Sequence, residues 1–128
     1  MKVKDLIKSP VTTCTTSADV GEVRDLMSVK KFSAMPVVEL DEDKATLKGI
    51  VSYHDLAGVQ DDDINVQQVM TYTVNVIDYD ATINEAARIM MDKHIHHLVV
   101  MREGQIAGII SSFDFVRVVA EEIELNVA

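Results

Sequence analysis

Two serine–aspartate pairs are the residues whose types and spacing could do chemistry. Ser52 precedes Asp55 by three positions, and Ser111 precedes Asp114 by the same interval. Each serine ends an apolar run, and each aspartate stands where a helix is expected to begin. A carboxylate at that place can accept two hydrogen bonds from a ribose diol, and the serine beside free helix N–H groups suits a phosphate. The same spacing also suits a helix cap, so spacing alone leaves both interpretations open.

Histidine and cysteine are the other residue types with chemical potential. His94, His96 and His97 lie close in sequence, but adjacent residues such as His96 and His97 point to opposite sides of a strand. We therefore expect no metal site. His54 is expected at the surface. Cys14 is the only cysteine and cannot form an internal disulfide, which favours a cytoplasmic location.

Composition excludes several classes of function. The formal net charge of −9 argues against nucleic acid and against an anionic membrane surface as partners. No apolar run is long enough to span a bilayer, and no signal peptide is recognisable. The sequence offers no glycine-rich phosphate loop with lysine, no nucleophile elbow, no His-Glu-x-x-His and no paired cysteine motif. We therefore expect a protein that is not an enzyme.

The elements that must position these residues occur twice, because the chain repeats itself. Val3–Ile7 aligns on Val66–Met70, an offset of 63 residues. Gly49–Ser52 aligns on Gly108–Ser111 after a slip of four residues, which we place in the polar loop around residues 41–44. The predicted organisation is a first repeat over 1–60, a linker over 61–65 and a second repeat over 66–128.

The residue pattern of each repeat predicts five elements in the order β-α-β-β-α. Helix starts are indicated by a capping box of Thr82 with Glu85 and by its weaker analogue, Asp19 with Glu22. A last helix is expected from about Asp55 or Asp114. The predicted strands are Val11–Thr15, Met35–Leu40 and Leu47–Ser52, then Val74–Asp78, Leu98–Arg102 and Ile106–Ser111. An α/β fold results, with the two β-α-β-β-α repeats packed about a pseudo-twofold axis and clefts between the copies.

The repeated motifs resemble those of cystathionine-β-synthase (CBS) domain pairs. The resemblance rests on Gly49–Asp55 and Gly108–Asp114, and on Phe32–Val38 and Ile95–Val100. It covers the chain from about Val3 to Glu122, and these segments look like those of the adenylate-sensing gamma subunit of a eukaryotic kinase. The resemblance implies adenosine-containing ligands in the clefts between the repeats, and a homodimer.

The resemblance also implies roles for individual residues. His96 and His97 would meet the phosphates of a nucleotide, but the closest copies of the family carry arginine where this chain has His97. Imidazole contacts an anion more weakly, which disfavours a triphosphate. The first repeat offers only Ser33 and Ala34 there. The candidate ligand-binding residues are Ser111, Asp114, His96, His97, Asn75, Val76, Ser52, Asp55, Thr13 and Ala34; Thr13, Asn75 and Val76 come from the extended segments that could hold adenine.

The predicted function is a regulatory module that binds an adenosine-containing small molecule. Candidate ligands are AMP, ADP, ATP and S-adenosylmethionine, with a mono- or diphosphate expected at the second repeat. No cofactor and no catalytic residue are expected, and an effector protein of unknown identity would receive the signal. Two alternatives stay open: a structural dimerisation module without a ligand, and a small enzyme acting on a nucleotide.

Overall fold

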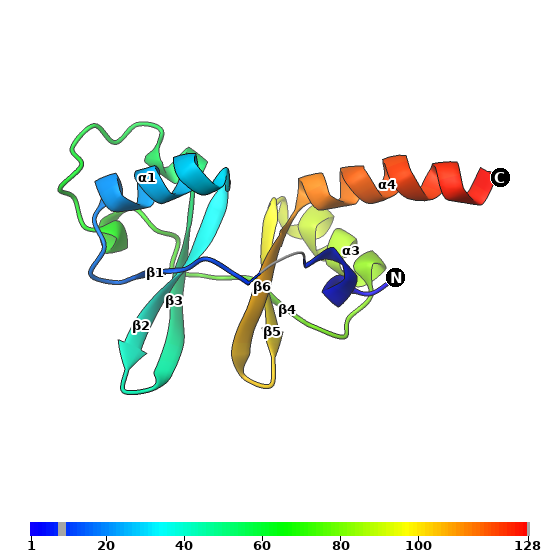
Figure 1. The fold of residues 1–128 in the computed structure, drawn as a ribbon, viewed down its shortest axis with the longest axis horizontal. Coiled ribbons are helices and arrows are strands. Elements are labelled where there is room, and N and C mark those ends of the chain that lie inside the picture. Colours follow the sequence, from blue (N-terminus) through cyan, green and yellow to red (C-terminus); the bar gives the residue numbers. More distant parts are fainter. Residues whose placement is uncertain (8–9, 128) are drawn as a thin grey trace. The chain divides into compact units, whose positions relative to one another are not determined.

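Two three-stranded sheets form the framework of the fold, with strand orders β1-β2-β3 and β4-β5-β6 (Figure 1). The computed structural model describes residues 1–7 and 10–127, with side chains described as far as Glu121. In each sheet the first strand runs parallel to the second, and the second pairs antiparallel with the third. The predicted α/β class and the order β-α-β-β-α, present twice, are confirmed.

The elements of the two repeats correspond one to one. Those of the first repeat are β1 (Cys14–Thr15), α1 (Val20–Lys30), β2 (Ala34–Asp41), β3 (Lys44–Ser52) and α2 (Tyr53–Leu56). Those of the second repeat are β4 (Val76–Asp78), α3 (Ile83–Lys93), β5 (His97–Arg102), β6 (Gln105–Ser111) and α4 (Ser112–Val127). Two short 3-10 helices, η1 (Val3–Leu6) and η2 (Val66–Gln68), precede them and were not predicted.

Both central helices begin where the sequence indicates. The N–H of Glu22 donates to Asp19 Oδ1 at 2.8 Å, and the N–H of Glu85 donates to Thr82 Oγ1 at 3.2 Å. These bonds satisfy two of the N–H groups that the first turn of a helix leaves without an internal partner. The predicted N-caps are therefore confirmed.

The first strand of each sheet is shorter than predicted, because β1 starts at Cys14 and β4 starts at Val76. In the second sheet the N–H of Val99 donates to the carbonyl of Asn75 at 3.1 Å. The residue equivalent to Val99 in the first repeat is Pro36, which has no N–H to donate. The parallel pairing of the first sheet therefore begins one residue later than that of the second.

The four extra residues of the first repeat lengthen its hairpin rather than its turn. β2 has 8 residues against 6 in β5, and β3 has 9 against 7 in β6. Both hairpins turn over two residues, Glu42-Asp43 and Glu103-Gly104. The slip therefore lies where the sequence predicts it, around residues 41–44, but the inserted residues pair across the hairpin instead of enlarging a loop, and their N–H and C=O groups are satisfied there.

The compact units do not coincide with the predicted repeats 1–60 and 66–128. One unit, called the first unit here, spans residues 11–74; the second unit combines residues 1–10 with 75–128. Val66 belongs to the buried core of the first unit, and Val3 to that of the second. Two equivalent backbone hydrogen bonds hold these segments in place. The N–H of Val66 donates to the carbonyl oxygen of Ala18 at 2.9 Å, and the N–H of Val3 donates to that of Ala81 at 2.8 Å.

Residues 1–10 thus pack with the second repeat and residues 66–74 with the first, an arrangement we call the exchange of segments. It explains the two glycines of the repeated motif. A Cβ on Gly49 would lie 2.6 Å from Met70 Sδ and 2.9 Å from the carbonyl oxygen of Thr71. A Cβ on Gly108, the equivalent glycine, would lie 3.0 Å from the side chain of Ile7. Each glycine thus admits the segment that follows the 3-10 helix of its own unit, and its role in the motif is packing.

Gly49→Ala should lower the stability of the protein by about 1–3 kcal/mol, because the backbone oxygen of Thr71 cannot move aside without breaking its own pairing. Thermal unfolding measures the loss. The matched control is Gly58→Ala, since a Cβ there meets nothing within 4 Å and the backbone is not left-handed. That variant should be neutral or slightly more stable. Equal losses at the two positions would contradict the packing role.

Candidate functional site

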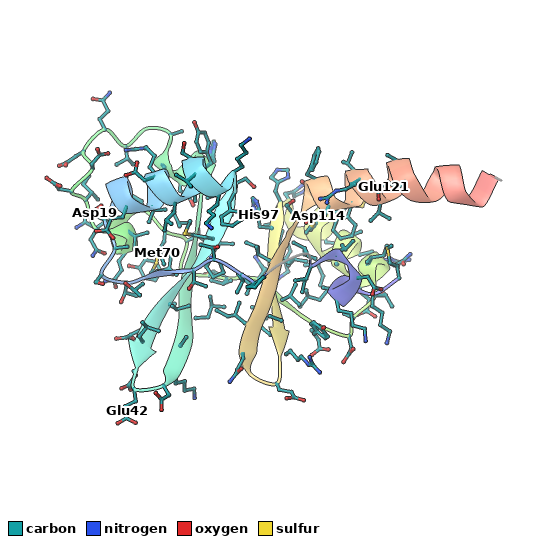
Figure 2. All side chains as sticks on the ribbon, in the orientation of Figure 1. Asp19, Glu42, Met70, His97, Asp114 and Glu121 are labelled. Carbon is teal, nitrogen blue, oxygen red and sulfur yellow. The ribbon has the colours of Figure 1, made fainter. Side chains whose placement is uncertain are left out.

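The strand register brings the candidate residues of the second repeat to one end of their sheet. Val76 pairs with Val99, so Asn75 lies beside the start of β5. His97, the first residue of β5, pairs with Ser111, the last residue of β6. Figure 2 shows His97 and Asp114 at this same end, where β6 passes into α4. We call this group, formed by Asn75, His96, His97, Ser111 and Asp114, the β6–α4 corner.

Asp114 makes polar contacts through both of its carboxylate oxygens. Its Oδ2 accepts the N–H of Ser111 at 2.8 Å, with the Ser111 hydroxyl at 3.4 Å. Its Oδ1 accepts Nη2 of Arg117 at 2.6 Å, and the two side chains are only 17% and 28% exposed. Partial burial makes this ion pair stronger than a solvated one. The carboxylate is therefore held in a fixed orientation at the first turn of α4.

His94 and His96 lie at the ends of different elements. His94 ends α3 as a left-handed cap with φ 53°, and its N–H donates to Met90 O. His96 is exposed; its carbonyl accepts the N–H of Ser112 at 2.9 Å, and its Nδ1 lies 3.4 Å from the Ser112 hydroxyl. His96 is thus joined to the start of α4, on the rim of the β6–α4 corner.

The first repeat builds the same corner with different side chains. The N–H of Ser52 donates to Asp55 Oδ2 at 2.8 Å, and the N–H of Asp55 donates to Ser52 Oγ at 3.2 Å. Ala34 takes the place of His97: it pairs with Ser52 in the sheet and is buried, and its methyl side chain offers no polar group to a ligand. Thr13 lies just before β1 and His54 is exposed. In both repeats the aspartate accepts the N–H of the serine three residues earlier, and in the first repeat the serine hydroxyl also caps the helix.

Arg117 is the functional candidate that sequence reasoning missed. Its guanidinium pairs with Asp114 and lies 6.0 Å from the centre of the Phe113 ring. The signal was the i,i+3 spacing from Asp114, which places both side chains on one helix face. Comparison of the repeats concealed it, because the first repeat has Gly58 at the equivalent position. Asp55 accordingly has no guanidinium partner among the described side chains.

Cys14 is not suited to nucleophilic chemistry. Its thiol is buried in the core of the first unit, and that burial raises the pKa of Cys14 to about 11, with a smaller contribution from the nearby charge of Glu22. The thiolate, which is the reactive form, is therefore scarce at neutral pH.

The part of the chain that the structure describes contains no group of three His, Cys, Asp or Glu side chains able to hold a metal ion. No helix within residues 1–7 and 10–127 combines the length and apolar character needed to cross a bilayer.

The repeated architecture corresponds to a known family. The model of the CBS domain matches twice, over residues 3–62 and 66–121. The chain therefore belongs to the CBS domain family and carries a pair of CBS repeats, as the sequence motifs predicted.

Individual relatives extend this assignment. The chain is 31% identical to protein MJ1232 of Methanocaldococcus jannaschii, covering 98% of this chain and 42% of that protein. It is 30% identical to inosine-5′-monophosphate dehydrogenase of the same organism, covering 91% of this chain and 23% of the enzyme. The chain thus spans less than half the length of these relatives. The CBS domain pair of protein MJ0100, solved with 5′-methylthioadenosine and S-adenosyl-L-methionine, superposes with a TM-score of 0.84 at 22% identity, covering 95% of this chain and 98% of that one.

Proposed function

We propose that this protein is a regulatory module that binds an adenosine-containing metabolite at the β6–α4 corner, and that it is not an enzyme. The observation that carries the proposal is the fixed Asp114 carboxylate, which is paired with Arg117 at the end of the sheet where His97 pairs with Ser111 and His96 is joined to Ser112. The adenosine-type ligands of the MJ0100 domain pair support this ligand class. The signal would pass to an effector protein.

Asp114 retains the acceptor capacity that a ribose needs. A carboxylate offers about four lone-pair sites, two on each oxygen. Oδ1 uses one for Arg117, and Oδ2 uses one for the N–H of Ser111. The Ser111 hydroxyl, at 3.4 Å, can rotate toward another partner. Two acceptors, one on each oxygen, would match the two hydroxyls of a vicinal diol.

Charge favours a ligand with one or two phosphates. The corner has two imidazoles, and Arg117 is paired with its Asp114, whereas the equivalent positions of the first repeat hold Ser33, Ala34 and Gly58. Free N–H groups in the first turn of α4 add to the attraction for an anion. The net charge of −9 opposes a triphosphate. AMP and ADP are therefore preferred over ATP, with S-adenosylmethionine as the ligand expected if the positive groups play no part.

The test is ligand-induced thermal stabilisation. At roughly 100 times its dissociation constant, a ligand should stabilise the wild-type fold by about 2.7 kcal/mol. That corresponds to an upward shift of several degrees in Tm for a domain of this size. Asp114→Ala should abolish the shift, because the ribose loses its acceptor.

Asp55→Ala is the matched control. Both substitutions remove the carboxylate that accepts the N–H of the serine three residues earlier, so both should lower the starting Tm, by about 1 kcal/mol of stability for each cap. Asp114→Ala also removes the ion pair with Arg117, so its starting Tm should be the lower of the two. Only Asp114→Ala should remove the response to the ligand. An Asp114→Ala protein that keeps the full shift would refute the site. A wild-type protein unmoved by AMP, ADP, ATP and S-adenosylmethionine would favour the structural dimerisation module instead.

A further inference from the structure

The two Ser-x-x-Asp corners differ in charge. Three residues after the aspartate, the second repeat has Arg117 and the first repeat has Gly58. An ionised carboxylate repels a phosphate brought near it, so an aspartate alone disfavours a phosphorylated ligand. Arg117 Nη2 lies 2.6 Å from Asp114 Oδ1 and offsets that charge, whereas Asp55 has no guanidinium partner among the described side chains. The β6–α4 corner therefore combines an acceptor for hydroxyl groups with a cation.

The guanidinium of Arg117 is held on two sides. Asp114 and Phe113 precede it by three and four residues, and residues at these spacings share a helix face. Asp114 accepts one N–H, and the centre of the Phe113 ring lies 6.0 Å from the guanidinium carbon, at the limit of a cation–π contact. A guanidinium has five N–H donors in a rigid fork, and the side chain of Arg117 stays 28% exposed. Donors other than the one bound to Asp114 can therefore face a ligand from a fixed position.

Arg117 is also less exposed than the other basic side chains of its unit. Every other lysine or arginine that the structure describes there is exposed, a set formed by Lys2, Lys4, Arg88, Lys93 and Arg102. Water and salt screen an exposed charge, whereas a partly buried charge acts more strongly on a group beside it. Arg102 also lies at the far end of the sheet, because it ends β5 and His97 begins it. Position and partial burial thus suit Arg117 to the recognition of an anion at the corner.

We propose that Arg117 is the specificity-determining residue of the β6–α4 corner, and that it selects ribosides carrying a phosphate over uncharged ribosides. The carboxylate of Asp114 accepts the ribose hydroxyls, and the outer edge of the guanidinium donates to phosphate oxygens attached to the same ribose. The planar fork suits this contact because it offers two parallel N–H groups to two oxygens. The inference rests on the proposed function, because it requires that a riboside binds at this corner.

Calorimetric titration of the full-length protein with adenosine and with AMP tests the role of Arg117, because the two ligands differ only by the phosphate. The wild-type protein should bind AMP at least about tenfold more tightly than adenosine, as expected of hydrogen bonds to a charged group. In Arg117→Gln the ratio of the two affinities should fall to near unity. Arg117→Lys keeps the positive charge without the fork, so its ratio should lie between those of the other two proteins.

Arg102→Gln is the matched control, since it removes the same charge from an exposed residue at the far end of β5. Its ratio should equal that of the wild type, and an equal fall in both variants would mean that net charge alone selects the ligand. An Arg117→Gln protein that binds both ligands more weakly by the same factor would overturn the proposal, because Arg117 would then only hold Asp114 in place. A wild-type protein that binds adenosine and AMP equally well would also overturn it, although the site would stand. Binding of neither ligand would instead refute the proposed function, and the role of Arg117 with it.

Discussion

A fragment of residues 1–63 should remain unfolded, although it contains the complete first repeat of the sequence. The core of the first unit includes Val66 and Met70, which this fragment lacks. The fragment retains Val3 and Leu6, but their contacts lie in the core of the second unit. It therefore loses buried side chains from its own core and carries others that have nothing to pack against. Circular dichroism should show no cooperative thermal transition.

The matched control is a fragment of residues 11–74, which has almost the same length and includes every buried residue of that core. Burying a valine or methionine contributes about 1.5–3 kcal/mol, so two such residues decide the fate of a unit whose total stability is marginal. The 11–74 fragment should show more helical signal and a sharper transition than 1–63. A cooperative transition in monomeric 1–63 would contradict the exchange of segments.

The sequence could reveal the order of the elements but not this exchange. Helix starts at Asp19 and Thr82 follow from local chemistry, since each side chain caps a helix only three residues away. Val3 and Val66 also appear in the repeat, but a repeat says only that two segments are alike. Whether Val66 enters the core before it or the core after it depends on the long-range bond to Ala18, and no local pattern encodes that bond.

The candidate site shows the same division. The Ser111–Asp114 spacing predicted a carboxylate at a strand-to-helix corner, and the structure places it there with the cap that the spacing also allowed. The repeated motif does not predict a role for Arg117, because the equivalent residue of the first repeat is Gly58 and the motif consists of the residues that both repeats share. The guanidinium of Arg117 distinguishes the corner of the second repeat from that of the first, and a comparison limited to shared residues does not reveal it. A prediction based on the charge of each corner separately would have found it.

Val66→Asp should be the most damaging substitution considered, and its effect should appear in the first repeat although Val66 belongs to the second in sequence. Val66 is fully buried, and an unpaired carboxylate there costs several kcal/mol, a large part of the stability of a small protein. Val29→Asp is the control, since Val29 is 77% exposed and its replacement should change stability by no more than about 0.5 kcal/mol. The milder Val66→Ala, at about 2 kcal/mol, should keep the fold and allow hydrogen exchange to locate the damage. Amides of β2 should then exchange roughly 30-fold faster while those of β5 change less. Greater loss of protection in β5 than in β2 would show that Val66 stabilises its own repeat after all.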